Sequence, residues 1–458
     1  MVTEQPIDAY SRALFTDLYE LSMMQAYYAE GMTATAVFEL YFRELPTNRN
    51  YVMVAGLDDV LQYLETLHVN DDEVAWLHQQ RQFDERFLQQ LGDLRFTGDV
   101  YAVPEGTVVF ENEPVFQIVA PLPEAQFIET YVLNQIHAQS VVASKAARIV
   151  TAAQGRQVVD FGSRRSHGAD AALKVARASY LAGAAGTSNV AAGRLYDIPI
   201  YGTMAHSYIQ AHDDELSAFR AFVRQFPQTT LLVDTYDTLN GVQAVIELAR
   251  ELNDDFKVGA IRLDSGDLTE LSKGARALLD AAGLHDVKII ASSGLDEHEI
   301  ANLLAAEAPI NGFGVGTKLA VSRDAPDIDF SYKLVDYNHR PCMKLSPHKR
   351  LLPGRKQVFR VVQDGRLVRD VLARHGEMLD GEALLRPVMR HGKRLDAGRV
   401  SLTEAREHAE VQLQALPAEL RQLTRVEPGY RVDVSPALQA MADVLQGELQ
   451  KQRTEGRA

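Results

Sequence analysis

The sequence predicts an α/β protein whose central part forms an irregular, incomplete (β/α) barrel, preceded by a region of mixed α+β structure and followed by a C-terminal extension. From Val158 onward, short apolar runs alternate with amphipathic stretches, and repeated strand–helix units of this kind form parallel sheets. The candidate strands are 158–162, 187–190, 198–201, 230–234, 258–263, 287–292, 312–315 and 332–336. Eight strands within about 180 residues are too compressed for a complete eight-fold barrel, so we expect some helices to be short or missing.

The part of the chain before Val158 predicts helices and strands in mixed order. The apolar spacing indicates helices over 10–30, 54–66, 71–92 and 124–154, a strand over 35–43, and short strands with turns over 96–119. In the first helix, Thr16 is expected to be the N-cap, because its hydroxyl can accept a hydrogen bond from the first turn. Tyr19 lies beside the apolar stripe of this helix, and the spacing alone favours an aromatic side chain at the edge of the core.

Helices fit between the candidate barrel strands at 168–183, 213–226, 239–252, 269–282 and 296–306. Strands over 357–375 and 385–395 follow the barrel, and two helices end the chain. Ser401 with Glu404 predicts a capping box for the first of these helices, and Ser435 before Pro436 predicts a capped start for the second.

Composition limits the function classes. The 458 residues are enough for two or three domains, and the net charge of −15, from 47 Lys and Arg against 62 Asp and Glu, argues against nonspecific binding to nucleic acid. The single cysteine, Cys342, excludes an intramolecular disulfide and is typical of a reducing compartment. The sequence has no apolar run of roughly 18 residues and no signal-peptide pattern, so we expect a cytoplasmic protein that does not bind a membrane.

The segment from Val158 to Ser207 is expected to carry the chemistry. In parallel (β/α) structures the functional side chains follow the carboxyl ends of the strands, and here small or charged residues follow each apolar run. Between Val158 and His206, five Lys or Arg residues stand against three Asp. A locally basic segment in an acidic chain indicates an anionic ligand.

Arg262, Asp264 and Asp267 follow the candidate strand 258–263. Strand alternation places Arg262 and Asp264 on one side, with Asp267 one turn further along. The guanidinium can bind a carboxylate through two hydrogen bonds, and the two Asp side chains are suitable ligands for Mg²⁺ on a phosphorylated substrate. An Arg–Asp ion pair that only stabilises the end of the strand is the other reading of this pattern.

Small residues follow the next two candidate strands, in Ser292-Ser293-Gly294 and in Gly312-Phe-Gly314-Val-Gly316-Thr317. Exposed backbone N–H groups and a Thr hydroxyl together predict a phosphate-binding nest. Lys318 could instead serve as the Schiff-base lysine of a barrel lyase, although the sequence shows no group that would activate it.

His206 follows Gly202-Thr203-Met204-Ala205, where a strand is predicted to end and a helix to begin. A neutral imidazole at that place can act as a base, or it can accept a phosphoryl group whose charge the helix end would stabilise. A histidine that only bonds backbone at a strand end is the alternative. A zinc pair with His212 is disfavoured, because no HExxH-type spacing is present.

Taken together, these motifs resemble those of nicotinate phosphoribosyltransferases, a family of type II phosphoribosyltransferases. The similarity keeps the family's order over about residues 10–375. It rests on Thr16-Asp-Leu-Tyr19, Asp160-Phe-Gly-Ser-Arg164, Gly186-Thr-Ser188-Asn, Gly202-Thr-Met-Ala-His206-Ser, Val233-Asp234-Thr-Tyr, Ile261-Arg262-Leu-Asp264-Ser-Gly-Asp267 and Gly314-Val-Gly-Thr317.

The resemblance implies an N-terminal α+β sandwich domain over 1–155, an irregular α/β barrel with the active site over 156–345, and C-terminal strands and helices over 346–458 that complete or decorate the first domain. It implies an entry step of NAD salvage, in which nicotinate and 5-phosphoribosyl 1-diphosphate (PRPP) give nicotinate mononucleotide and diphosphate, with Mg²⁺ and coupled ATP hydrolysis. In the family the histidine that matches His206 is transiently phosphorylated. Family members are homodimers with shared active sites.

The resemblance also implies roles for individual residues. Tyr19 would stack on the pyridine ring in the partner's site, opposite Phe161, and Arg262 would hold the carboxylate with Thr203 and Ser188 nearby. The residues expected to contact PRPP are Arg164, His167, Asp234, Gly294, Gly314, Gly316 and Thr317. Arg164 would face the diphosphate, and Asp264 would take part in catalysis and, with Asp267, bind Mg²⁺.

Ser188 bears on the choice of base. The related nicotinamide enzyme carries Asp at this position, and an anionic side chain there would repel a carboxylate. Quinolinate would need a second cationic partner. We therefore expect nicotinate as the substrate, with a nicotinamide phosphoribosyltransferase or a noncatalytic phosphoribosyl-binding regulator as alternatives.

Overall fold

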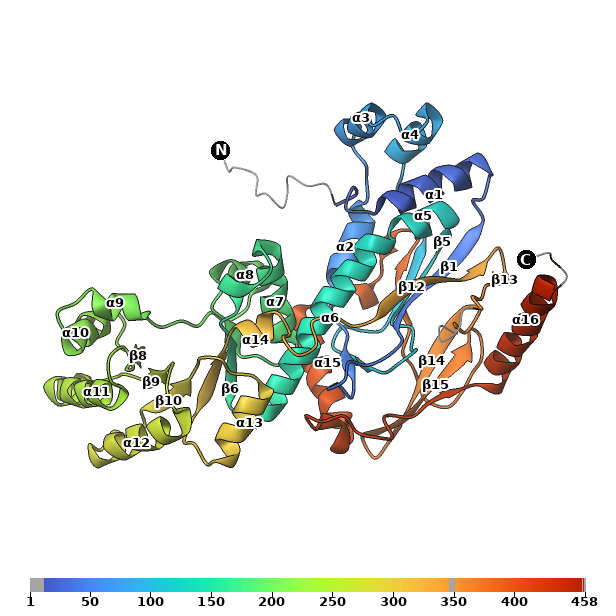
Figure 1. Ribbon diagram of the computed structural model, residues 1–458. Helices are drawn as coiled ribbons and strands as arrows, with labels where there is room; N and C mark the ends of the chain where they lie inside the picture. The colour runs from blue at the N-terminus through green and yellow to red at the C-terminus, as the bar shows by residue number, and fades with distance from the viewer. Residues whose placement is uncertain (1–11, 346–350, 455, 457–458) are drawn as a thin grey trace. The chain divides into compact units, whose positions relative to one another are not determined.

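The computed structural model describes residues 12–345, 351–454 and 456 of the chain. The chain forms two compact units, Met1–Val141 with Asp327–Ala458 and Val142–Pro326 (Figure 1). We call them the sheet unit and the barrel unit. The division into 1–155, 156–345 and 346–458 stays a prediction.

The sheet unit is built on a seven-stranded sheet of order β13-β12-β1-β5-β3-β17-β18, whose strand pairs are antiparallel. A four-stranded sheet (β16-β14-β15-β19) and a two-stranded sheet (β2-β4) accompany it. The strands are β1 (Thr35–Phe42), β2 (Val52–Met53), β3 (Asp99–Ala102), β4 (Val108–Val109), β5 (Phe116–Pro121), β12 (Phe330–Tyr337), β13 (Arg340–Pro341), β14 (Lys356–Gln363), β15 (Arg366–Arg374), β16 (Glu382–Ala383), β17 (Arg386–Arg390), β18 (Lys393–Arg394) and β19 (Val432–Val434). The helices are α1 (Leu18–Ala29), α2 (Leu57–Thr66), α3 (Asp71–Gln79), α4 (Glu85–Gly92), α5 (Leu122–Phe127), α15 (Leu402–Ala415) and α16 (Pro436–Thr454), while α6 (Glu129–Ala152) runs from this unit into the other.

The strand predicted over 332–336 exists, but its assignment to the barrel was wrong. β12 pairs antiparallel with β1, with Phe38 opposite Leu334 and Leu40 opposite Tyr332. The rings of Phe38 and Tyr332 stack at 4.9 Å in the apolar core of the sheet unit. An apolar run shows that a strand will form but does not show which sheet it joins, and the partner here lies about 290 residues earlier in the chain.

The barrel unit holds a six-stranded parallel sheet of order β7-β6-β11-β10-β9-β8. Its strands are β6 (Gln157–Asp160), β7 (Gly186–Thr187), β8 (Thr230–Leu232), β9 (Ala260–Leu263), β10 (Lys288–Ala291) and β11 (Gly312–Val315). When the sheet is followed around as a ring, its strands come in chain order from β6 to β11. The ring is open between β7 and β8. The predicted incomplete (β/α) barrel is therefore confirmed.

The opening lies where two strands were predicted. The predicted strand 187–190 ends early, because Thr187 accepts a hydrogen bond from the Asn189 N–H and Asn189 then caps α8 (Val190–Tyr196). The predicted strand 198–201 forms a single bridge, between Thr187 and Ile200. On its other side the Thr203 hydroxyl donates to the carbonyl of Thr230 in β8. The segment thus crosses the opening without completing the ladder.

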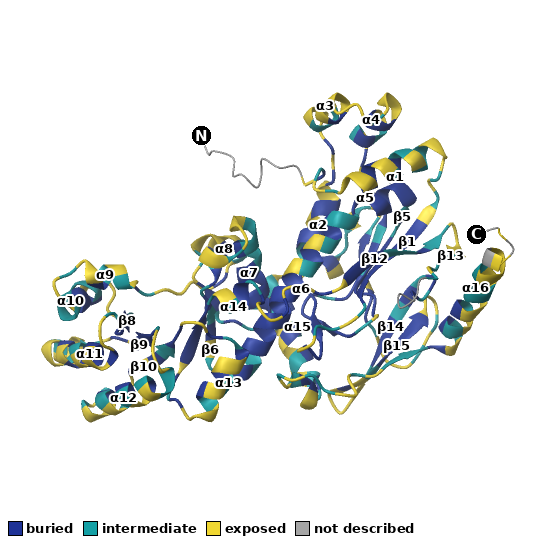
Figure 2. Cartoon of the chain, viewed as in Figure 1, coloured by how far each residue is buried: buried dark blue, intermediate teal, exposed yellow. Residues whose placement is uncertain are grey.

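Helices cover the barrel sheet and bury one face each, while their outer faces are exposed (Figure 2). They are α7 (Ala169–Leu181), α10 (Glu215–Gln225), α11 (Thr238–Leu252), α12 (Leu268–Ala281) and α13 (Glu297–Ala305), all within two residues of the predicted bounds, together with the short α9 (His206–Gln210) and α14 (Thr317–Ala320). Gly241 lets α11 approach the sheet closely, since a Cβ there would lie 2.1 Å from the carbonyl oxygen of Val233.

Three local predictions for the sheet unit need correction. The helix expected over 71–92 is two helices, α3 and α4, and the one expected over 124–154 is α5 followed by α6. Thr16 does not cap α1. The N-cap position is Asp17, and the Thr16 hydroxyl instead bonds the Glu20 carboxylate and the carbonyl of Phe127. The capping box of Ser401 and Glu404 is confirmed.

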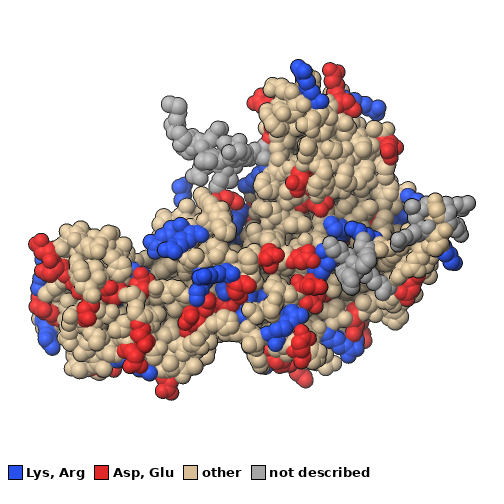
Figure 3. Space-filling model, in the orientation of Figure 1, with Lys and Arg blue, Asp and Glu red and all other residues tan. Residues whose placement is uncertain are grey.

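Acidic and basic side chains lie interspersed on the face drawn in Figure 3. Within the described ranges, no helix is long and apolar enough to cross a membrane.

Candidate active site

The carboxyl ends of the barrel strands surround two adjoining cavities. The first, which we call the anion cavity, has a volume of about 350 Å³ and five cationic side chains in its wall, those of Arg164, Arg165, Arg262, Lys318 and Arg323. Among the residues that the structure describes, Asp264 is the one carboxylate in that wall. This excess of positive charge in a concave site favours a multiply charged anion.

Small residues complete the wall of the anion cavity, namely Ser292, Ser293, Gly294, Gly314, Gly316 and Thr317. Ser293 and Gly294 both have left-handed backbone conformations, with φ of +80° and +64°. Such a conformation costs a serine free energy, and residues held in it are enriched at active sites and ligand-binding turns. The predicted phosphate nest and this cavity therefore involve the same residues.

The second cavity, also about 350 Å³, is lined by His206 and is called the histidine cavity below. Ser188 and Thr203 belong to its wall, and it shares Phe161, Arg164, Arg262 and Asp264 with the anion cavity. Two sites of different chemistry therefore meet at one set of side chains.

Arg262 lies at this junction and is only 8% exposed. Its two terminal nitrogens donate to the hydroxyl of Ser292 at 3.2 Å and the carbonyl of Met204 at 3.0 Å. Its Nε is buried without a hydrogen-bond partner among the described residues. Burial lowers the pKa of the guanidinium, against the opposing effects of Asp264 and Asp234. A buried cation with an unused donor is ready to bind an anionic group.

Asp264 connects Arg262 to His206. Its Oδ1 lies 3.4 Å from Arg262 and also accepts a hydrogen bond from Ser292, while its Oδ2 lies 3.6 Å from Nε2 of His206. The carboxylate of Asp234 helps to hold Asp264 in place, because it accepts a hydrogen bond from the Asp264 N–H at 2.8 Å.

His206 is the first residue of α9, as the sequence predicted. Its Nδ1 lies 3.2 Å from the Thr235 hydroxyl, and 40% of its side chain is exposed. The Thr235 hydroxyl is thus within hydrogen-bond distance of one ring nitrogen, and the imidazole remains accessible from the cavity.

Phe161 and Arg164 are positioned by Asp160 at the end of β6. The buried carboxylate of Asp160 accepts hydrogen bonds from the Gly162 N–H and the Thr187 hydroxyl, and burial raises its pKa. The ring of Phe161 fits against Gly314, where a Cβ would lie 2.4 Å from the ring.

Three protein-family models match successive parts of this chain. The nicotinate phosphoribosyltransferase N-terminal domain matches residues 14–137, the nicotinate phosphoribosyltransferase family matches 156–347, and the C-terminal domain matches 375–442. The chain belongs to the nicotinate phosphoribosyltransferase family.

Relatives and solved structures agree with this assignment. The chain is 57% identical over 441 residues to the nicotinate phosphoribosyltransferase pncB2 of Mycobacterium tuberculosis, covering 96% of this chain and 94% of that protein. It is 42% identical to the nicotinate phosphoribosyltransferase of Bacillus subtilis over 82% of this chain and 79% of the relative. The crystal structure of human nicotinic acid phosphoribosyltransferase superimposes with a TM-score of 0.82 at 28% identity, covering 94% of this chain and 99% of that one. The family and the enzyme class predicted from the motifs are confirmed.

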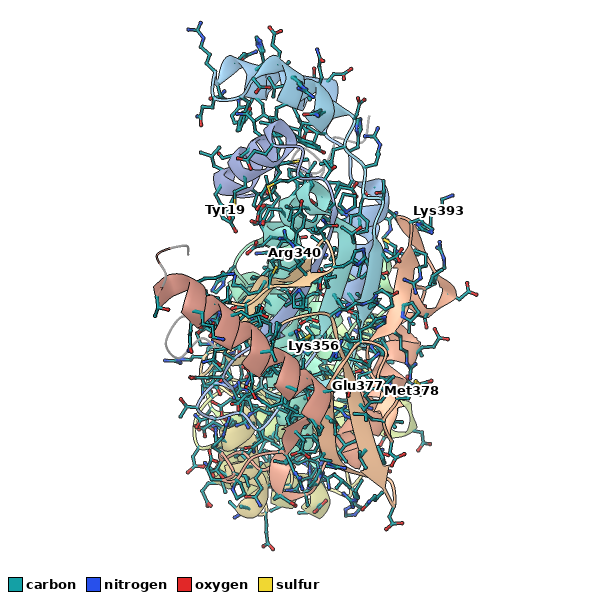
Figure 4. The ribbon with its side chains drawn as sticks, turned by 90° about the vertical axis from the view of Figure 1, so that its right-hand side faces the viewer. Tyr19, Arg340, Lys356, Glu377, Met378 and Lys393 are labelled. Atoms are coloured by element: carbon teal, nitrogen blue, oxygen red, sulfur yellow. The ribbon has the colours of Figure 1, made fainter. Side chains whose placement is uncertain are left out.

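Some of the predicted site residues lie away from the two cavities. Asp267 is the N-cap of α12, where its carboxylate accepts the N–H groups of Thr269 and Glu270. His167 is exposed and belongs to neither wall. Tyr19 lies on α1 in the sheet unit, at its surface (Figure 4), with 46% of the residue exposed. Burial and Glu129 raise the pKa of its phenol. Their predicted roles stay predictions.

Two features of the site were missed from the sequence. Arg323 follows α14 rather than a strand, so strand-end reasoning does not find it. From the sequence, Lys318 was considered only as a nucleophile. In the structure its ammonium lies 2.8 Å from Asp296 and lines the anion cavity, where its positive charge can attract an anion. The basic residues close to the loop Gly312–Thr317 were the feature of the sequence that could have indicated both roles.

Proposed function

We propose that this chain transfers the phosphoribosyl group of PRPP to nicotinate, giving nicotinate mononucleotide and diphosphate, with ATP hydrolysis coupled through His206. The observation that carries the proposal is that Phe161 and Arg262 line both the anion cavity and the histidine cavity. A pyridine carboxylate held there would have a phosphate site on one side and the imidazole on the other.

Arg262 is proposed to bind the carboxylate of nicotinate, and Phe161 to contact the face of its ring. The place of Arg262 in both walls and its Nε–H, which has no partner among the described residues, support this, because a guanidinium can bind a carboxylate through two hydrogen bonds. Ser188 and Thr203 lie in the same wall, and neither carries a charge that would repel a carboxylate.

In the transfer step the C1–O bond of PRPP breaks, the electron pair leaves with diphosphate, and the pyridine nitrogen forms the new bond to C1. The transition state has oxocarbenium character, so the protein contributes most by stabilising the leaving group and positioning the nitrogen. Arg164, Arg165, Lys318 and Arg323 are the cations available to the phosphates, with Gly316 and Thr317 at the 5-phosphate.

The described residues contain no group of three or more His, Cys, Asp or Glu side chains that could hold a metal ion. Mg²⁺ often uses only one or two carboxylates and takes its other oxygens from phosphates, and Asp264, 30% exposed in the anion cavity, fits that role. Mg²⁺ bound in this way would neutralise charge on the leaving diphosphate.

His206 is proposed to attack the γ-phosphorus of ATP through an unprotonated ring nitrogen, so that an N–P bond forms as the bond to the β-phosphate oxygen breaks and ADP leaves. Water later cleaves the N–P bond and releases phosphate. Its exposed ring and its contacts to Thr235 and Asp264 support this role. The added negative charge, close to Arg164 and Arg262, would reorganise the cations around the substrates.

We further propose a homodimer with a shared active site, in which Tyr19 of one subunit serves the site of the other. Val190, Leu195 and Ile200 are each more than half exposed beside the barrel opening, next to the histidine-cavity residue Ser188. Apolar side chains gathered in one exposed segment favour a protein interface. A cytoplasmic location stays a prediction.

The test is to incubate the protein with nicotinate, PRPP, Mg²⁺ and ATP labelled in the γ-phosphate, with His206→Ala in parallel, and to follow nicotinate mononucleotide and acid-labile protein label. We expect wild type to form product and carry the label, and the variant to lose the label and the stimulation by ATP. Product from nicotinamide but not from nicotinate would overturn the choice of base. PRPP binding without product from either base would favour the noncatalytic regulator.

A further inference from the structure

A cluster of four charged side chains, three of them buried, lies in the barrel unit, outside the two cavities. Lys145 and Arg148 come from α6, Glu297 is the first residue of α13, and Asp324 follows α14. The Lys145 ammonium lies 2.5 Å from Glu297 and 2.6 Å from Asp324, and Arg148 Nε lies 2.9 Å from Glu297. The side chains of Lys145 and Glu297 are 1% and 0% exposed.

The cluster holds two segments, one that carries cations of the anion cavity and one that pairs with such a cation. Asp324 is bonded directly to Arg323 in the chain, and the Arg323 N–H donates to the carbonyl of Lys318 at 3.2 Å. The turn is closed by Ser322, whose hydroxyl donates to the carbonyl of Ala325 at 2.7 Å. A fixed Asp324 therefore fixes the backbone from which Arg323 reaches the cavity.

The second segment is the start of α13. Asp296 caps this helix with one carboxylate oxygen and pairs with Lys318 through the other. The adjacent Glu297 is held by Lys145 and Arg148. One lysine of α6 thus contacts both Asp324, which follows Arg323 in the chain, and Glu297, which follows the Lys318 partner Asp296.

Net stability does not explain such a cluster, because well-packed apolar residues often replace buried ion pairs without loss. What ion pairs supply is fixed geometry. Burial alone would raise the pKa of Glu297, but Lys145 and Arg148 outweigh that effect and lower it. The carboxylate therefore stays ionised and keeps both partners in place at neutral pH.

We propose that Lys145 is a positioning residue for the phosphorylated substrate: through Asp324 and Glu297 it sets where Arg323 and Lys318 stand in the anion cavity. This inference rests on the proposed function, since it takes the anion to be PRPP or its diphosphate product. A cation that is displaced from its position binds a phosphate less tightly. Displacement of Arg323 or Lys318 should therefore lower the affinity for PRPP and for diphosphate.

The test measures the dissociation constants of PRPP and of inorganic diphosphate by calorimetry in the presence of Mg²⁺. Two variants change the net charge in opposite directions, since Lys145→Met removes a positive charge and Asp324→Ala removes a negative one. We expect both to weaken binding of both probes, by about tenfold for Lys145→Met and several-fold for Asp324→Ala. A pure charge effect would weaken binding in the first and strengthen it in the second, and that outcome would overturn the proposal.

A double-mutant cycle asks whether the effect passes through Arg323. In an Arg323→Gln background, Lys145→Met and Asp324→Ala should change diphosphate affinity much less than in wild type, because the positioned group is gone. Full additivity would overturn the proposal. Asp324 is 24% exposed, so Asp324→Ala remains testable if Lys145→Met does not fold.

Lys356→Met is the matched control. Lys356 is also a buried lysine paired with a buried glutamate, Glu39, at 2.7 Å, but it lies in the sheet unit at the start of β14 (Figure 4). We expect it to lower the melting temperature and to leave diphosphate affinity unchanged. Equal loss of affinity in this control would show a general effect of destabilisation and would overturn the proposal. If wild type binds neither probe, the proposed function itself fails.

Discussion

Arg262 combines burial, two terminal nitrogens that each donate a hydrogen bond, and an Nε–H that has no partner among the described residues. Lysine carries the same charge but cannot reproduce the planar fork, so Arg262→Lys should lose hydrogen bonds to the substrate while keeping the positive charge. We expect the KM for nicotinate to rise at least tenfold, or about 1.4 kcal/mol, with a smaller change in the KM for PRPP.

Steady-state kinetics with each substrate varied in turn checks this prediction. The exposed Arg220→Lys on α10, where the arginine pairs with Glu251, is the control and should behave like wild type. A variant Arg262→Lys with an unchanged KM for nicotinate would remove Arg262 from the carboxylate site.

Glu20 makes the stability of the sheet unit depend on pH. Burial raises its pKa from 4.5 to about 7, although hydrogen bonds from Thr16 and Thr130 act in the opposite direction. Between these two values the unfolded chain has released the proton and the folded chain still holds it. The free energy of unfolding should therefore fall as pH rises from about 4.5 to about 7, by up to about 3 kcal/mol from this group.

Glu20→Gln has no proton to lose, so its denaturant midpoint should vary less over that interval than that of wild type. Chemical unfolding at a series of pH values measures the difference. Parallel curves for the two proteins would show that Glu20 is already ionised at low pH in the folded state.

At the scale of the element, β11 places Gly314 against the ring of Phe161. In Gly314→Ala the new methyl would lie 2.4 Å from the ring, so the ring must move. A ring can rotate away at modest cost in stability, but it then leaves the junction of the two cavities. We expect kcat/KM for nicotinate to fall about tenfold or more, while the melting temperature changes by only a few degrees.

Gly259→Ala, next to β9 in the same sheet, is the matched control, because the nearest atom to its new methyl is 3.9 Å away. It should keep wild-type kinetics. Wild-type kinetics in Gly314→Ala as well would mean that the position of the Phe161 ring does not matter to the reaction.

Elements also show why some of the predicted strands form and others do not. β6, β9, β10 and β11 are short apolar runs that end in charged or small residues, and each was found within two residues of its bounds. The segment 198–201 has the same pattern but forms only one bridge. Its pairing depends on whether β7 and β8 come close enough to accept a strand, which the local residues do not encode.

At the scale of the whole molecule, the proposed shared site can be tested by complementation. His206→Ala should lose the ATP-stimulated reaction in its own site, and Tyr19→Ala should disable that reaction in the partner's site. In a mixed dimer one site carries both substitutions and the other carries neither. Random mixing should therefore restore about a quarter of wild-type activity.

The measurement is to unfold and refold the two variants together and compare product formation with that of each variant refolded alone. Sedimentation in parallel reports the oligomeric state. Mixed samples that stay inactive although dimers form would show that each site is built within one subunit.

The sequence by itself determined where most strands and helices form, which residues follow the strand ends, and the family. Motifs such as Asp160-Phe-Gly-Ser-Arg164 are local, and strand alternation alone places Arg262 and Asp264 on the same side. The contact of Arg262 with Ser292 follows from the neighbouring positions of the parallel strands β9 and β10.

Only the tertiary structure decided that the strand at 330–337 pairs with β1, that the barrel is open between β7 and β8, and that Lys145 lies beside Glu297 and Asp324. These contacts join residues far apart in the chain. Their formation depends on the packing of whole elements, whose energy is a sum over many weak contacts, so no single stretch of sequence carries it.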